Sequence, residues 1–344
     1  MAGWRQKSLH DFGIRGFCRL AMRGWRRGLG IAPSSHGLHP NRQGLMVAVD
    51  RNGRNAAGVT AVPLRSRAKN WVRRSLPLAL RKQLAVWIGR RAWLPSSRHW
   101  WSNEIVRDLA ERDISEYHRF MWANHLGYAE TYEVEKRYGA DQVHPARHML
   151  FADLRDFMED RSNDPQAIDS VLEVGCSMGY LLHHMEQTVF PTARVLDGVD
   201  IDAYAIEQGA AYLKQRDSRV RLVVGDMSQV GTLFESKYDV VLCAGVLMYL
   251  PEDQALEVVR AMLARTSKYL AVAGLAHPEI DNKDMKASTS RASDQSLIHN
   301  IDRMIDRAGG RVLWRRWEGA RKVDGNTIYF LIAEPGSAPA AIIA

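Results

Sequence analysis

The second half of the sequence alternates short β-rich runs with segments of helical character. Five runs rich in Val and Leu follow Asp169, at 170–174, 193–199, 219–224, 238–243 and 268–274. Helical segments are expected between them, near 178–188, 203–215, 228–235 and 252–265. This order is typical of a parallel, doubly wound sheet that is covered by helices on both faces.

Two more β-rich runs follow near the end of the chain, at 311–317 and 326–333. The connecting sequence EGARKVDG has the composition of a turn and is too short to contain a crossover helix. Parallel neighbours need such a crossover, so this pair must be antiparallel. The sequence therefore predicts an α/β fold with a doubly wound, mostly parallel seven-stranded sheet and an antiparallel last strand.

Charge and composition divide the rest of the chain. Residues 1–100 hold 20 of the 47 Lys and Arg side chains but only two acids, whereas the remainder is acidic overall. We expect five regions. They are a basic, disordered arm at 1–65, a basic amphipathic helix at 66–95, a helical cap over a substrate or cofactor pocket at 96–165, the α/β domain at 166–336 and a flexible tail at 337–344.

The segment at 78–94, LALRKQLAVWIGRRAWL, has the spacing of an amphipathic helix. We expect Leu80 and Leu84 on its apolar face, and Arg81 and Lys82 on its other faces. Such a helix packs against the protein's own core or lies on an anionic membrane surface, and the sequence leaves both alternatives open. No stretch approaches the roughly 20 uninterrupted apolar residues of a membrane-spanning helix.

A loop rich in small residues follows the first β-rich run, in VLEVGCSMGY at 171–180. Gly175 and Gly179 allow a ligand to approach the backbone closely, and the helix that follows directs free N–H groups at polar ligand atoms. The order Glu173-x-Gly-x-Ser177-x-Gly differs from the GxGxxG spacing of dinucleotide sites. By itself, this pattern also fits a close strand-to-helix turn that binds nothing.

Two acids make a ligand site more specific. Asp200, in DGVDID, and Asp226, in VVGDM, each stand at the carboxyl end of a β-rich run, and these ends line one crevice in a doubly wound sheet. A carboxylate can accept hydrogen bonds from both ribose hydroxyls or from an exocyclic amine. A lone Asp at such a position is more often a helix cap. The glycine loop, Asp200 and Asp226 follow three strands in the right order, and together they favour a ligand site over a set of helix caps.

With these residues, the segment 166–335 resembles the class I S-adenosylmethionine-dependent methyltransferase superfamily. The resemblance implies a Rossmann-like domain that binds S-adenosylmethionine, with Ser177 in place of a more usual glycine. Asp200 would bind the ribose, and Asp226 would flank the adenine. The implied cofactor residues are Glu173, Gly175, Cys176, Ser177, Gly179, Asp200, Ile201, Asp226, Met227, Ala244 and, from the helical cap, Tyr132.

The resemblance implies methyl transfer but does not fix the acceptor, and we predict an oxygen or nitrogen atom of a small-molecule, glycan or lipid-linked acceptor. An RNA methyltransferase that uses the basic arm is the alternative, although the acidic remainder disfavours nucleic acid. A cofactor-binding protein without catalysis is a third possibility. His277 follows the run at 268–274, so we predict that it emerges in the acceptor pocket and acts either as general base or as an orienting hydrogen-bond partner. The alternative is a loop histidine without a chemical role.

The cysteines Cys18, Cys176 and Cys243 are far apart and lack the spacing of a metal site. We therefore expect no bound metal and a cytoplasmic protein. Contact between the 66–95 helix and an anionic membrane would place it peripherally at the membrane surface.

Overall fold

The structure is a computed structural model that describes residues 73, 75–91, 97–127, 134, 138–139, 143–161, 164–291, 294–323 and 325–336. The described residues all belong to one compact unit, residues 62–344. The predicted arm at 1–65, the predicted tail at 337–344 and Tyr132 lie outside the described residues, so these predictions stay untested.

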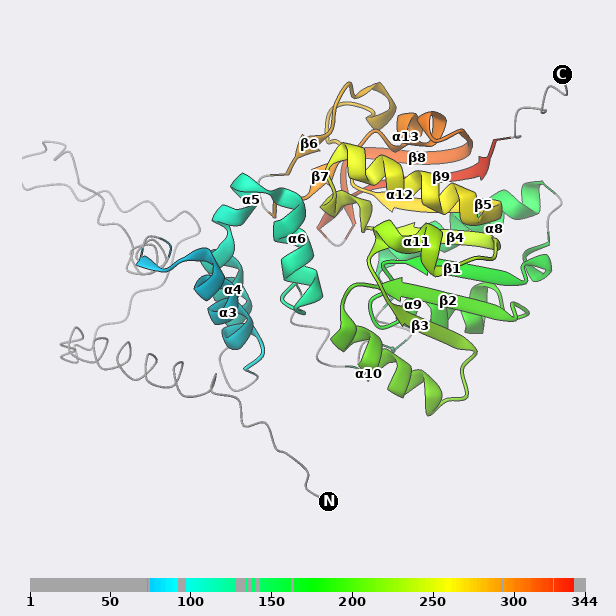
Figure 1. The fold of residues 1–344 in the computed structure, drawn as a ribbon. Helices are drawn as coiled ribbons and strands as arrows, with labels where there is room; N and C mark the ends of the chain where they lie inside the picture. Colours follow the sequence, from blue (N-terminus) through cyan, green and yellow to red (C-terminus); the bar gives the residue numbers. More distant parts are fainter. Residues whose placement is uncertain are drawn as a thin grey trace, which may run out of the picture. The chain divides into compact units, whose positions relative to one another are not determined.

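A seven-stranded sheet forms the centre of the described fold (Figure 1). Its order is β3-β2-β1-β4-β5-β9-β8. The strands β1 to β5 pair in parallel, and β9 is antiparallel to both of its neighbours. The predicted doubly wound sheet with an antiparallel last strand is therefore confirmed. The strands are β1 Ser170–Val174, β2 Val195–Asp200, β3 Val220–Val224, β4 Tyr238–Ala244, β5 Thr266–Gly274, β8 Gly310–Val323 and β9 Asn326–Pro335.

Helices bury both faces of the sheet, because successive strand residues point to opposite sides. Val171 joins the core cluster beneath α8, α9 and α10, whereas Leu172 joins the cluster beneath α11, α12 and α13. Their bounds are α8 Pro145–Asp160, α9 Tyr180–His184, α10 Ala203–Lys214, α11 Val230–Leu233, α12 Glu252–Arg265 and α13 Ile301–Arg307.

Short turns complete this part of the fold. A π-helical turn, Met185–Val189, extends α9, and 3₁₀ turns cover Pro165–Ala167, Met227–Gln229, Leu247–Tyr249 and Asn282–Asp284. The strands β6 Thr289–Ser290 and β7 Leu297–Ile298 form a small separate ladder. Capping fixes where helices begin: the carboxylate of Asp202 accepts a hydrogen bond from the backbone N–H of Ala205 at the start of α10.

Within the part of the chain that the structure describes, four helices precede α8 and enclose a small core of their own. They are α3 Leu78–Gly89, α4 Ser97–Val106, α5 Asp108–Arg112 and α6 Ile114–Ala123. Gly89 lets α3 approach closely, since a Cβ atom there would lie 2.3 Å from Leu126 Cδ2. No helix in the described residues is long and apolar enough to cross a membrane.

The buried face of α3 differs from the prediction. Leu80 is 49% exposed, whereas Arg81 is buried and its guanidinium binds both carboxylate oxygens of Asp108 and the carbonyl of Ile105. Lys82 pairs with Glu116. The prediction was wrong for Leu80 and Arg81, because Asp108 and Ile105 compensate the buried charge of Arg81. Leu84 packs against the small core as expected. The helix packs on this small core, and membrane contact through 66–95 stays a prediction.

Candidate functional site

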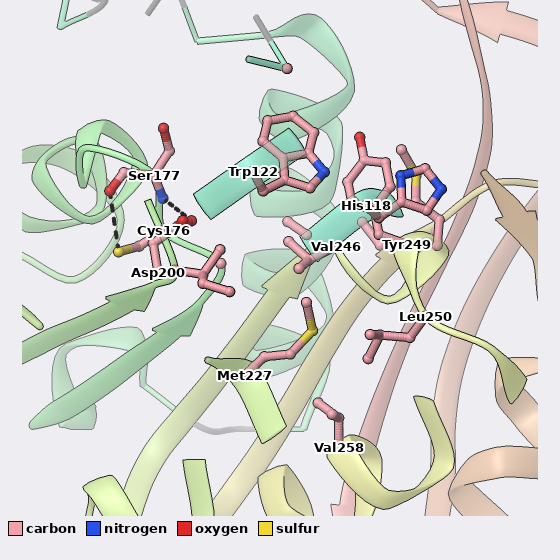
Figure 2. A pocket seen from close by; sticks show the side chains of 18 of the residues that line it. His118, Trp122, Cys176, Ser177, Asp200, Met227, Val246, Tyr249, Leu250 and Val258 are labelled. Atoms are coloured by element: carbon pink, nitrogen blue, oxygen red, sulfur yellow. Dashed lines mark hydrogen bonds between the residues drawn. The ribbon is translucent and has the colours of Figure 1, made fainter. Parts of the chain in front are cut away.

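A pocket of about 1100 Å³ opens at the carboxyl ends of the parallel strands. Loops after β1, β2, β3, β4 and β5 contribute to its lining, and so do β9, α6 and the start of α8. Figure 2 shows side chains from the β1 and β2 ends on one side of this pocket and aromatic side chains on the other. Parallel sheets bind their ligands at this edge.

The loop after β1 has the left-handed backbone that its glycines permit. Gly175 has φ +79°, and a Cβ atom there would lie 2.3 Å from Val246 Cγ2. The loop satisfies several of its own N–H groups, because Gly175 and Cys176 both donate to the carbonyl of Val199. These two N–H groups are therefore not free for a ligand, whereas ligand contacts of the N–H groups at the start of α9 stay a prediction. The loop instead provides a close approach to bare backbone, which suits a bulky cofactor.

Ser177 occupies the position where the related family more usually has glycine, and it is strained. Its φ is +51°, a conformation that costs L-residues roughly 1–2 kcal/mol. We expect Ser177→Gly to raise the free energy of unfolding by about 0.5–1 kcal/mol, since the glycine's greater freedom in the unfolded chain offsets part of the relief. Urea denaturation measures the change.

The matched control for this substitution is Gly179→Ala in the same loop. Gly179 has φ +78°, and a Cβ atom would lie 2.7 Å from Leu222 Cδ2, so this variant should lose about 1–3 kcal/mol. A Ser177→Gly protein that is less stable than wild type would show that the serine side chain makes a stabilising contact that outweighs its strain.

Asp200 connects this loop to the end of β2. Its two carboxylate oxygens accept one backbone N–H each, from Ser177 at 2.7 Å and from Asp202 at 2.9 Å. Burial raises the pKa of the Asp200 carboxyl, although these hydrogen bonds oppose the shift. Each oxygen keeps a second lone pair. Asp200 thus lines the pocket with two acceptors in fixed positions, which fits a pair of ribose hydroxyls.

Glu173, at the end of β1, has an unpaired polar atom at the pocket. The residue is 2% exposed, and its Oε2 atom has no hydrogen-bond partner among the described residues. Burial raises the pKa of this carboxyl to about 8; the charge of Arg147 opposes the shift, and Asp200 adds to it. A buried acceptor without a partner is costly unless a ligand supplies a donor or a cation. The ammonium and sulfonium groups of S-adenosylmethionine are such cations.

Asp226, at the end of β3, already has two roles within the protein. Its Oδ1 atom caps the turn Met227–Gln229 by accepting from the backbone N–H of Ser228 at 2.9 Å. Its Oδ2 atom pairs with Arg119 of α6 at 2.8 Å. Ile201, Met227 and Ala244 line the pocket as well. The adenine contact of Asp226 remains a prediction, and a bound adenine would share this carboxylate with Arg119.

Cys176 lines the pocket with its side chain turned into the core. It is 1% exposed, and a Cβ atom on Gly198 would lie 2.7 Å from its Sγ atom. Burial raises the pKa of the Cys176 thiol well above its usual range. The side chain therefore acts in packing, and a contact to the cofactor would have to come from its backbone.

His277 does not lie in the pocket, in contrast to the prediction. Its Nδ1 atom accepts hydrogen bonds from the backbone N–H groups of Glu279 and Ile280, at 3.2 and 3.1 Å. The backbone N–H of His277 donates to Oδ1 of Asn282. The residue is absent from the pocket lining in the described part of the chain. The loop after β5 turns sharply here, and the imidazole stabilises that turn. A catalytic role for His277 thus has no geometric basis.

Many residues of the pocket lining could not be identified from the sequence, among them His118, Trp122, Arg147 and Tyr249. Arg147 lies in the first turn of α8 and donates to the carbonyl of Ala244 at 2.7 Å, which places a cation beside Glu173. The spacing of apolar residues in the predicted helical cap, residues 96–165, does not indicate which of its side chains face the sheet. Within the described residues, no group of three His, Cys, Asp or Glu side chains could hold a metal ion.

The sheet order, the glycine loop and the strand-end acids define a Rossmann-like cofactor domain. Residues 171–268 match a family model described as a methyltransferase domain. The chain therefore contains an S-adenosylmethionine-dependent methyltransferase domain. No curated protein matches the sequence.

Solved structures of similar fold include three methyltransferases. The Leishmania major S-adenosylmethionine-dependent enzyme is 16% identical and has a TM-score of 0.46, over 65% of this chain and 82% of that one. CcbJ from Streptomyces caelestis is 15% identical, with a TM-score of 0.44, 60% of this chain and 96% of that one. The magnesium protoporphyrin IX methyltransferase of Synechocystis PCC 6803 is 16% identical and has a TM-score of 0.43, over 60% of this chain and 95% of that one.

Proposed function

We propose that this enzyme transfers the methyl group of S-adenosylmethionine to an oxygen or nitrogen atom of a small-molecule acceptor. The observation that carries the proposal is the size of the pocket, because about 1100 Å³ exceeds what a single compact ligand usually fills. The cofactor would occupy the side formed by Glu173, the glycine loop and Asp200. The acceptor would occupy the side formed by α6 and the loop after β4.

Two residues of the pocket lining support the fit of the cofactor. Glu173 offers an unpaired carboxylate oxygen to a cation, and Gly175 leaves room that any side chain would fill. The sulfonium methyl is already electrophilic, so the protein mainly has to orient the acceptor and exclude water. Residues of α6 that close over the sheet edge suit that task.

We also propose that the enzyme works in the cytoplasm. Cys176 and Cys243 are both free and buried, and neither has a disulfide partner among the described residues. Free thiols are typical of reducing compartments.

The proposal is tested by incubating the full-length protein with S-adenosylmethionine labelled in the methyl group and a fractionated cell extract. We expect the label to enter the small-molecule fraction, and not to do so with Asp200→Ala. Label in glycan or lipid fractions would make the acceptor the polar end of a larger molecule. Label in RNA would contradict the small-molecule proposal and favour the alternative that uses the basic arm.

A further inference from the structure

Three rings form a wall on the acceptor side of the pocket, and we call His118, Trp122 and Tyr249 the aromatic wall. His118 and Trp122 lie on α6, and Tyr249 ends the turn after β4. The Tyr249 ring lies 5.0 Å from the Trp122 ring and 4.9 Å from the His118 ring, measured between centroids. All three line the pocket (Figure 2). The Tyr249 ring is inclined by 50° to the Trp122 ring and by 49° to the His118 ring, so a planar ligand ring can stack on the face of one of them while its edge contacts another.

The position of Trp122 within the wall is fixed from behind. Gly127 packs against its ring, because a Cβ atom at Gly127 would lie 2.4 Å from Trp122 Cζ3. The wall also adjoins the cofactor side, since Val246, three residues before Tyr249, contacts Gly175 of the glycine loop. A ring stacked on the wall would therefore lie next to the cofactor.

His118 is the residue of the aromatic wall that can accept a proton. It is 5% exposed, and its Nε2 atom lies 3.1 Å from the carbonyl oxygen of Gln295. A carbonyl accepts only, so Nε2 must hold the proton and donate it. Nδ1 is then the unprotonated nitrogen, and it has no partner among the described residues. The pocket is thus lined by a buried imidazole whose acceptor nitrogen is unused.

The surroundings of His118 keep it neutral at neutral pH. Burial lowers the pKa of the imidazole, and the hydrogen bond to Gln295 and the charge of Asp294 oppose the shift. Asp294 is itself paired with Arg291, and the ring of Tyr249 is the titratable neighbour on the sheet side. A neutral imidazole can accept a proton, which an imidazolium cannot.

We propose that the acceptor is a planar aromatic molecule with a hydroxyl group, that it stacks on Trp122 with its edge against Tyr249, and that Nδ1 of His118 takes its proton. This inference rests on the proposed function. The acceptor oxygen forms a bond to the methyl carbon, and the carbon–sulfur bond breaks with its electron pair left on sulfur. The hydroxyl proton passes to Nδ1, so the positive charge moves from the sulfonium to the imidazolium, which later returns the proton to water.

A hydroxyl needs this help more than an amine does. A neutral amine attacks through its own lone pair and can lose its proton afterwards, whereas a hydroxyl becomes a strong nucleophile as its proton leaves. A fixed neutral base beside the aromatic wall therefore favours an aromatic hydroxyl over an aromatic amine as the acceptor group.

The first test measures binding to the full-length protein saturated with S-adenosylhomocysteine. The probes are 1-naphthol, 2-naphthol, 7-hydroxycoumarin and 8-hydroxyquinoline, with their methyl ethers and decahydro-2-naphthol as matched controls. We expect at least one aromatic hydroxyl compound to bind with a Kd below about 1 mM, and about five- to tenfold more tightly than its saturated counterpart. Trp122→Leu should remove that preference.

The second test separates His118 from the wall. In His118→Gln the amide N–H can still donate to Gln295, but no acceptor remains at the Nδ1 position. We expect the preference for hydroxyl over methyl ether to disappear. With labelled S-adenosylmethionine and a probe that binds, kcat should fall by about 10²–10⁴-fold and the acid limb of the kcat profile should be lost, while cofactor affinity stays within about twofold.

The outcomes are distinguishable. If S-adenosylhomocysteine itself does not bind, both the proposed function and this inference fail. If it binds but no aromatic probe does, or saturated controls bind equally well, this inference alone is overturned. Unchanged kcat in a folded His118→Gln protein also overturns it. If His118→Gln does not fold, the Trp122→Leu comparison still decides whether the wall binds planar rings.

Discussion

Asp200→Ala is expected to weaken the binding of S-adenosylmethionine by about 10- to 150-fold. The carboxylate would accept both ribose hydroxyls, and hydrogen bonds to a charged group contribute roughly 1.5–3 kcal/mol. The same carboxylate holds the N–H groups of Ser177 and Asp202, so its loss also loosens the glycine loop. Isothermal titration calorimetry gives the affinity, and thermal unfolding without ligand shows whether the variant is folded.

The control for this prediction is Asp169→Ala. Asp169 directly precedes β1 at the opposite end of the sheet, where its exposed carboxylate pairs with Arg194. That variant removes a carboxylate of the same kind away from the pocket, so cofactor affinity should stay at the wild-type value. A folded Asp200→Ala protein with unchanged affinity would show that the ribose lies elsewhere.

Cofactor binding at pH 7 is expected to release about one proton, and Glu173 is its source. Burial raises the pKa of this carboxyl to about 8 in the free protein, so the group is mostly protonated at pH 7. A cationic ligand next to the unpaired Oε2 favours the ionised form and expels the proton. Calorimetry in buffers of different ionisation enthalpy measures the number of protons released.

The same carboxyl sets a pH dependence for the free protein. Its pKa in the folded state exceeds its value in the unfolded state, about 4.5, so its contribution to stability is complete below pH 4.5 and is lost as the pH rises through 8. Glu173→Gln should remove both this loss and the proton release, and should bind the cofactor about tenfold more weakly. Equal proton release in Glu173→Gln would assign the proton to another group.

Much of the cofactor side could be predicted from the sequence because its information is local. The run at 170–174 is buried on both faces and therefore consists mainly of Val and Leu, with Glu173 as a buried ionisable exception. The glycines and Asp200 follow directly at strand ends, where topology alone brings them together. The order of the sheet confirms this reasoning, and the individual ligand contacts await measurement.

The acceptor side could not be predicted in this way. His277 and His118 look alike in the sequence, as single histidines beside apolar residues. His277 is turned away by a tight turn, while His118 enters the pocket through α6 and is held by Gln295, 177 residues further along the chain. Arg81 is a second example, because its burial depends on Asp108. No local pattern encodes a partner that only the tertiary fold supplies.

The two sides of the pocket therefore come from differently organised parts of the chain. The cofactor side is built by consecutive strand ends within residues 171–268, the segment that matches the family model. The opposite side draws on α6 and β9, which lie before and after that segment, together with Tyr249 from the loop after β4 within it. Substitutions outside the segment can thus change which acceptor is chosen while the cofactor site is inherited intact. Exchanging residues 97–127 between related enzymes, with Arg119 kept because it pairs with Asp226, is expected to change acceptor preference more than the affinity for S-adenosylmethionine.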